Sequence, residues 1–146
     1  MIYLSVFKLE SHIKLNIIAD LIGEDPTTFT TGSTSSILDD LERDSIAETK
    51  LYLDNYYDFD KIISGSTQIQ IYTRMLIDVF LFNLFQRANI DQMPTGILYN
   101  YEGTIKQLKD IAMRKLNPSD FPVKNNKYVA TTMDISTSDI KINFQD

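Results

Sequence analysis

The sequence predicts an all-α fold, a helical bundle of about four to five helices, followed by an extended C-terminal arm that contains a short β-strand. Through most of residues 1–122, apolar residues recur every three or four positions, the spacing that places them on one face of a helix. In residues 123–146 this spacing is lost, and Ile140, Ile142 and Phe144 alternate with polar residues as in a strand. We therefore expect a helical domain over residues 1–122 and an arm over residues 123–146.

The composition describes a single domain with its own hydrophobic core. The chain has 146 residues, of which 43% are hydrophobic, and it contains one His and no Cys. A chain of this length buries enough surface to fold without a metal or a disulfide, and the lack of Cys excludes thiolate chemistry and cysteine metal sites. The net charge of −6 disfavours nucleic-acid binding as a primary role, because such binding depends on Lys and Arg that neutralise phosphates.

Neither the N-terminus nor the most apolar segment predicts contact with a membrane. Residues 1–8 lack the basic start and the long apolar stretch of a signal peptide. Residues 75–85 are strongly apolar, but they include Asp78 and Asn83 and fall well short of the roughly 20 residues that span a bilayer. We interpret this segment as a core helix.

The first third of the chain predicts two short helical segments and a loop. Ser5 can cap a first short helix, and the apolar residues between positions 17 and 22 continue in helical spacing until Gly23, a typical helix stop. Residues 24–36 are rich in Thr, Ser, Gly and Pro, so they predict an exposed loop.

Three longer helices follow. Ser36 resembles a helix cap, and we expect a helix over about residues 37–56. The second covers about residues 67–88, whose apolar residues surround the helix and thus predict packing on most sides. The third runs from a cap at Thr95 to about residue 116 and ends before Pro118.

Two groups of residues are candidates for chemistry, and the sequence favours a structural reading of both. His12 lies in no motif that would supply a base with an orienting partner. Asp54, Asp58 and Asp60 suggest a calcium loop, but the segment lacks the central Gly and the final Glu of that motif. We interpret it as a polar segment that follows a helix. A carboxylate hydrolase that uses these three residues stays a minor alternative, and it would require a divalent metal.

Other charged residues in the predicted helices have ordinary interpretations. The acidic run Asp39, Asp40, Glu42 and Asp44 is expected to form a solvated face and to favour the positive end of its helix. Asp78 is expected to pair with Arg74, one helical turn earlier. The chain has no P-loop, no dinucleotide fingerprint and no hydrolase or metalloprotease motif, so we expect no enzyme activity and no cofactor.

Three segments, taken in order, resemble a known family. They are AETKLYLDNYYD at residues 47–58, DVFLFNL at residues 78–84, and YEGTIKQLKDIA at residues 101–112, followed by LNP at residues 116–118. They are similar to segments of the head-to-tail connector, or adaptor, proteins of tailed bacteriophages, including the Mu-like prophage group. The likeness covers about two thirds of the chain.

The resemblance implies a structural virion protein without catalysis. Such connectors form an oligomeric ring, typically twelve-fold, beneath the portal protein, and genomic DNA passes through the ring without specific binding. The expected partners are the portal protein, further copies of the chain and the next tail or stopper protein. The expected location is the virion neck, between capsid and tail, after assembly in the cytoplasm of the bacterial host.

The arm is the expected partner-binding segment, because an unpaired strand can add to the sheet of another chain. The residues that we expect at this contact are Tyr128, Val129, Ile135, Ile140, Ile142 and Phe144. The loop over residues 26–36 is a second candidate surface. The alternative function is a small non-viral helical interaction module that binds a partner by strand addition or helix packing.

Overall fold

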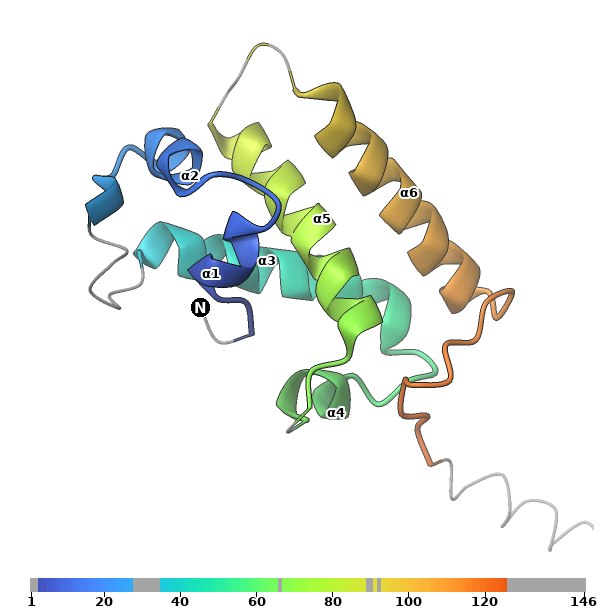
Figure 1. Cartoon of the computed structure of the whole chain (residues 1–146). Coiled ribbons are helices and arrows are strands. Elements are labelled where there is room, and N and C mark those ends of the chain that lie inside the picture. The colour runs from blue at the N-terminus through green and yellow to red at the C-terminus, as the bar shows by residue number, and fades with distance from the viewer. Residues whose placement is uncertain (1–2, 28–34, 66, 89–90, 92, 126–146) are drawn as a thin grey trace, which may run out of the picture.

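The computed structural model describes residues 3–27, 35–65, 67–88, 91 and 93–125. Within these residues there are six helices and no strand, so the predicted all-α class is confirmed. The helices are α1 (Val6–Glu10), α2 (Leu15–Ile22), α3 (Ser36–Leu53), α4 (Phe59–Ser64), α5 (Gln70–Arg87) and α6 (Thr95–Ala112) (Figure 1).

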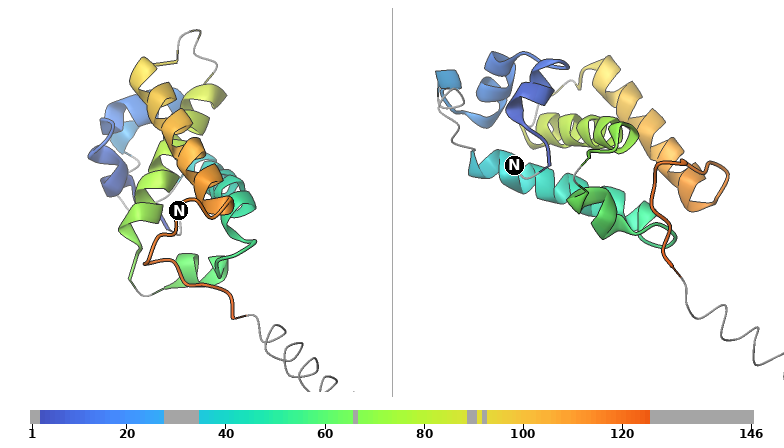
Figure 2. Two further views of the ribbon diagram at one scale, coloured as in Figure 1. Left: turned by 90° about the vertical axis from the view of Figure 1, so that its right-hand side faces the viewer. Right: turned by 60° about the horizontal axis from the view of Figure 1, so that its bottom comes forward.

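The three long helices α3, α5 and α6 pack against one another and form the core. In Figure 1, α3 crosses behind α5 while α6 runs beside it, and Figure 2 shows α1 and α2 on the side of α5 opposite α3. Helix α5 is therefore covered from several directions, as its apolar sequence predicted. Half of its residues are buried, including Tyr72, Leu76, Phe80 and Leu84.

Helix α3 buries polar residues as well as apolar ones. Glu42, Ser45 and Thr49 are at most 3% exposed, and each is satisfied by hydrogen bonds, as buried polar groups require. The Glu42 carboxylate accepts the backbone N–H groups of Tyr3 (3.0 Å) and Leu4 (2.5 Å). The prediction that the whole acidic run is solvated is therefore wrong for Glu42, which holds the N-terminal segment against the core.

Several helix ends differ from the predicted ones. The Ser35 hydroxyl, not that of Ser36, caps α3 by accepting the N–H of Ile37 at 3.2 Å. Helix α3 ends at Leu53, and the short α4 follows after Asp58, whose side chain accepts the N–H of Lys61 at 3.4 Å. Helix α4 escaped sequence analysis because it has only 6 residues, too few to show a periodic apolar stripe.

Among the described residues, no helix is both long enough and apolar enough to span a bilayer.

Candidate protein–protein interface

The predicted contact residues of the arm, from Tyr128 to Phe144, lie outside the described residues, and so do positions 28–34 of the predicted loop. The start of the arm is described, and it is fixed to the helical domain. The N–H of Asp58 donates to the Pro122 carbonyl at 2.7 Å, and the N–H of Lys124 donates to the Tyr56 carbonyl at 3.1 Å. These two bonds flank an antiparallel bridge between Tyr57 and Val123.

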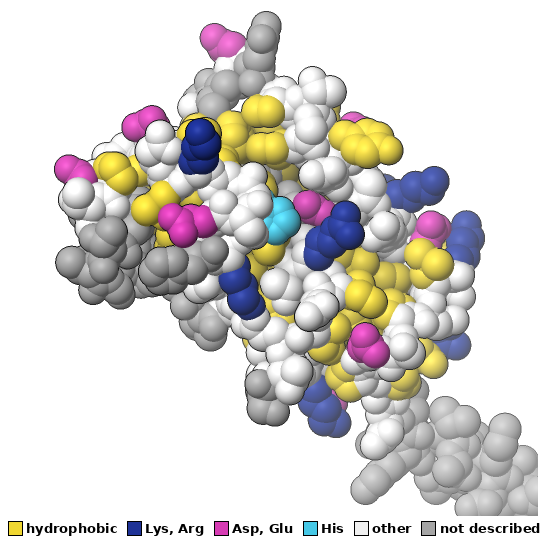
Figure 3. Space-filling model, viewed as in Figure 1, with side chains coloured by type: hydrophobic (Ala, Val, Ile, Leu, Met, Phe, Trp, Pro, Cys, Tyr) yellow, Lys and Arg dark blue, Asp and Glu magenta, His cyan; other side chains and the backbone are white. Residues whose placement is uncertain are grey.

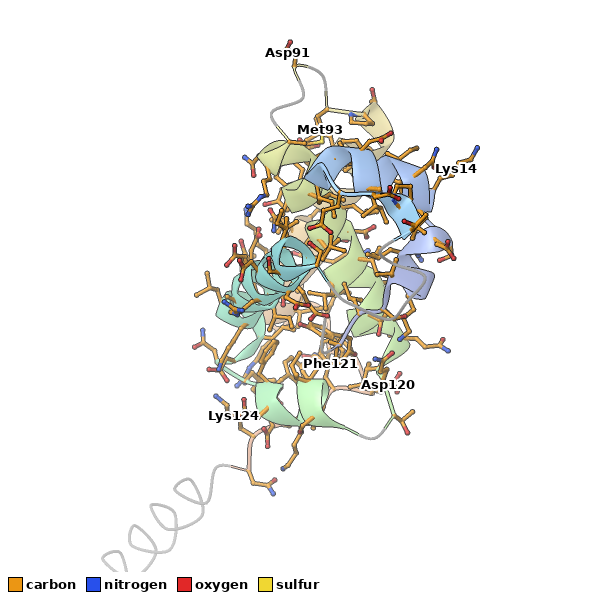
Figure 4. The ribbon with its side chains drawn as sticks, turned by 90° about the vertical axis from the view of Figure 1, so that its left-hand side faces the viewer. Lys14, Asp91, Met93, Asp120, Phe121 and Lys124 are labelled. Carbon is orange, nitrogen blue, oxygen red and sulfur yellow. The ribbon has the colours of Figure 1, made fainter. Side chains whose placement is uncertain are left out.

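Side chains reinforce this anchor of the arm. Phe121 is 3% exposed and packs edge-on against Tyr57, with ring centroids 5.3 Å apart. The Lys124 ammonium pairs with the Asp54 carboxylate at 3.0 Å and also donates to the backbone carbonyl of Asp54. Figure 4 shows Lys124 beside α4, where the described part of the arm ends. Residues 122–124, where the arm begins, are therefore bound to the helical domain by backbone and side-chain contacts.

The three candidate metal-loop carboxylates have separate structural contacts. Asp54 holds the arm anchor, and Asp58 caps α4 and pairs with the Lys61 ammonium at 2.8 Å. Hydrogen bonding to Lys61 holds the pKa of Asp58 below its ordinary value. Asp60 is exposed in the first turn of α4. No group of three or more His, Asp or Glu residues suited to a metal ion occurs among the described residues.

A groove of about 360 Å³ lies between α5 and α6. Ile71 and Tyr99 on its walls are 44% and 76% exposed. Most of the remaining lining is polar or charged, from Arg74, Asp78, Asn100, Thr104 and Gln107. At Gly103, an added Cβ atom would meet no other atom within 4 Å, so the groove is open above the helix backbone. Figure 3 shows this face of the molecule, with apolar side chains in yellow among charged ones.

The polar residues of the groove correct one prediction. Asp78 accepts a hydrogen bond from the Thr104 hydroxyl at 2.8 Å, a contact that joins α5 to α6. The expected ion pair between Asp78 and Arg74 is not among the ion pairs formed by the described residues. Both side chains line the groove. Arg74 also lines an adjoining hollow of about 420 Å³, together with Lys8 and His12 from the N-terminal segment.

On the α3 side of the core, a polar network joins all three long helices. The Tyr101 hydroxyl donates to Glu48 at 2.7 Å, and its ring stacks on Phe82 with centroids 3.8 Å apart. Asn83 donates to Ser45 at 3.1 Å and to Glu48 at 3.4 Å. Burial and the Glu48 carboxylate raise the pKa of Tyr101 above its ordinary value. The network therefore fixes α6 relative to α3.

The outer surface of α3 carries the most exposed large apolar side chain of the described residues, Leu51, at 77% exposure. Sequence analysis did not indicate that Leu51 points away from the core. It also missed the α5–α6 groove, for which the only signal was Gly103 in the interior of a predicted helix. A glycine in such a position is unfavourable and often allows another backbone or side chain to approach.

Comparisons with known proteins give no relative. No family model matches the chain, no curated protein is similar to it, and no solved structure matches its fold.

Proposed function

We propose that this chain is a structural protein of a tailed bacteriophage that forms an oligomeric ring between the portal and the tail. The observation that carries the proposal is the ordered likeness of three segments to connector proteins. These segments coincide with the second half of α3, the middle of α5 and most of α6. Most of the likeness therefore falls on the three helices that form the core, and the rest, at residues 54–58 and 116–118, follows α3 and α6.

The arm anchor and the exposed surfaces support the same proposal. A ring subunit needs two different surfaces for its neighbours and a third for the next component of the assembly. The described residues carry a groove with exposed Ile71 and Tyr99 on its walls, an exposed Leu51 on another helix, and an anchor for the arm at Tyr57. In this proposal the arm residues from Tyr128 to Phe144 bind the portal.

The alternative is a non-viral helical module that binds one partner through the arm or the groove. The same exposed surfaces favour it, because they do not by themselves require a ring. The two proposals differ in stoichiometry, since an interaction module binds its partner in a small fixed ratio while a connector forms a closed ring of many copies on the portal.

Mass photometry of the chain with the portal protein encoded in the same genome tests the proposal. We expect a complex with a defined number of copies on each portal ring, and loss of that complex in the double variant Ile140→Asp, Phe144→Asp. The variant Lys127→Asp is a matched control, because it reverses one charge near the start of the arm, and so changes the net charge as much as the double variant does, but leaves the alternating apolar residues intact. A chain that stays monomeric beside an assembled portal would contradict the connector function and favour the interaction module.

A further inference from the structure

We propose that the hollow between the N-terminal segment and α5, together with the adjoining α5–α6 groove, binds a small organic phosphate. The inference goes beyond the connector function and does not depend on it. Lys8, His12 and Arg74 line the hollow of about 420 Å³, which we call the cationic hollow. Arg74 also lines the groove of about 360 Å³. Each volume lies within the range of small-molecule sites, roughly 300–1,000 Å³.

The cationic hollow gathers positive charge on a chain whose net charge is −6. Lys8 and Arg74 are cations, and His12 adds a third charge when it is protonated. Among the described residues that line this hollow, none carries a carboxylate, and none of the three basic side chains takes part in an ion pair formed by the described residues. A hollow lined by one sign of charge concentrates ions of the opposite sign. The charge distribution therefore favours an anion.

The basic side chains come from two segments that are far apart in the sequence, and hydrogen bonds at Tyr3 hold these segments together. The Gln68 amide donates to the Tyr3 carbonyl at 2.7 Å, and the Tyr3 and Thr73 hydroxyl groups bond to each other at 3.2 Å. Gln68 and Thr73 also line the hollow. The bonds that attach the N-terminal segment to the core therefore fix the wall of the site before a ligand arrives, which lowers the entropic cost of binding.

The donors of the cationic hollow suit a phosphate better than a carboxylate. A carboxylate has two oxygens, and a single guanidinium such as that of Arg74 can engage both of them with parallel hydrogen bonds. A phosphate monoester has three terminal oxygens and a charge close to −2. It therefore also offers an acceptor to the compact ammonium group of Lys8 and to the ring of His12.

The adjoining groove indicates that the phosphate carries a polar organic group. Asn100 and Gln107 line the groove with amides, and the Tyr99 ring is 76% exposed on its wall. Asp78 accepts the Thr104 hydroxyl at 2.8 Å, and its carboxylate has further lone pairs for a ligand hydroxyl. Because this carboxylate would repel a second phosphate, the groove suits the hydroxyl groups of a sugar. The expected ligand class is therefore a sugar phosphate.

Isothermal titration calorimetry of the full chain tests the site, with ribose 5-phosphate, inorganic phosphate and ribose as probes. We expect ribose 5-phosphate to bind severalfold more tightly than inorganic phosphate, and ribose to give no binding heat. Ribose 5-phosphate that gives no heat, or that binds no more tightly than inorganic phosphate, would overturn the proposal. So would tighter binding of a single-stranded oligonucleotide, because it would assign the cationic hollow to a nucleic-acid backbone.

Charge variants locate the binding. Arg74→Gln and Lys8→Gln each remove one cation from the hollow, and each is expected to weaken the binding of ribose 5-phosphate by roughly tenfold, because a hydrogen bond to a charged group is lost. Lys109→Gln is the matched control, since it removes the same charge from an exposed position that lines neither the hollow nor the groove. Equal weakening by Lys109→Gln would show an effect of net charge alone and would overturn the proposal.

A variant in the groove separates its contribution from that of the hollow. Asn100→Ala is expected to weaken the binding of ribose 5-phosphate severalfold and to leave inorganic phosphate unaffected. Unchanged binding of ribose 5-phosphate in this variant would contradict the role of the groove. None of these measurements involves a ring or a portal, so their failure leaves the connector function untouched, and a chain that binds no portal leaves this site untouched.

Discussion

At the scale of single residues, two buried tyrosines differ in how their hydroxyl groups are satisfied. Tyr72 is fully buried, and its hydroxyl bonds to Thr49 at 2.9 Å. Tyr57 is 2% exposed, but its hydroxyl has no hydrogen-bond partner among the described residues. An unpaired buried hydroxyl costs free energy, while a paired one contributes to stability. The two residues therefore form a natural comparison.

We predict that Tyr57→Phe leaves the free energy of unfolding unchanged or raises it by about 1 kcal/mol, because it removes an unpaired hydroxyl without changing the packing. Tyr72→Phe should lower it by about 1 kcal/mol, since the bond to Thr49 is lost while the Thr49 hydroxyl keeps its bond to the Ile46 carbonyl. Urea denaturation of both variants measures the difference. Equal destabilisation by the two substitutions would show that the Tyr57 hydroxyl has a partner in solution.

The same buried hydroxyl groups predict how stability depends on alkaline pH. Burial raises the pKa of Tyr72 and of Tyr101 above the ordinary value of 10.0. A raised pKa in the folded state means that the unfolded chain ionises first, so this contribution to stability is complete below pH 10 and is lost as the pH rises above it.

We therefore expect the free energy of unfolding to fall with pH above about 10, and Tyr101→Phe to make that fall shallower. The matched control is Tyr99→Phe, because Tyr99 is 76% exposed and should leave the slope unchanged. Thermal unfolding between pH 8 and pH 11 provides the measurement. A slope that is identical in the three proteins would contradict the raised pKa of Tyr101.

At the scale of elements, the arm anchor and α6 each rest on an identifiable contact. The anchor depends on Phe121, packed against Tyr57, and on the backbone bonds of residues 122 and 124. Helix α6 contains Gly103, whose backbone is ordinary for a helix, whereas Gly23 closes α2 with a positive φ of 72°. These contacts and backbone conformations determine which truncations and substitutions each element tolerates.

Truncation separates the anchor from the rest of the arm. Removal of residues 126–146 should leave the helical content and the midpoint of unfolding unchanged, because the anchor stays in place. Phe121→Ala should lower the free energy of unfolding by roughly 3–5 kcal/mol, the usual cost of deleting a buried aromatic ring. Circular dichroism during thermal unfolding tests both expectations. Unfolding of the truncated chain would show that the arm packs on its own core.

The two glycines should respond in opposite ways to the same substitution. Gly103→Ala is expected to raise the free energy of unfolding by about 1 kcal/mol, because alanine favours the helix and its Cβ atom meets nothing. Gly23→Ala is expected to lower it by roughly 1–2 kcal/mol, because left-handed backbone is strained for alanine. Urea denaturation compares them, and a loss of stability in Gly103→Ala would contradict the open groove.

At the scale of the whole molecule, the sequence predicted the three long helices well and their surroundings less well. Apolar spacing located α3, α5 and α6, because packing on a common core imposes that spacing. It could not show that Glu42 turns inward, since the bonds that satisfy it come from Tyr3 and Leu4, almost 40 positions away. The anchor at Tyr57 and the groove at Gly103 likewise depend on contacts between distant segments, which periodicity does not encode.

Periodicity in the sequence also does not reveal the surfaces on which function depends. The ordered segments within α3, α5 and α6 predict a connector, while the surfaces on either side of these helices emerge only once the helices are packed. In the proposed function, surfaces of the helical domain bind neighbouring copies, and the arm that is anchored at Tyr57 binds a third protein. The proposed function requires that these copies close into a ring around DNA.

Cryo-electron microscopy of the chain mixed with the portal protein of the same genome tests that claim most directly. We expect a closed ring of copies beneath the portal, with the arm of each copy in contact with the portal. Portal particles that carry no ring, beside a chain that remains monomeric, would contradict it.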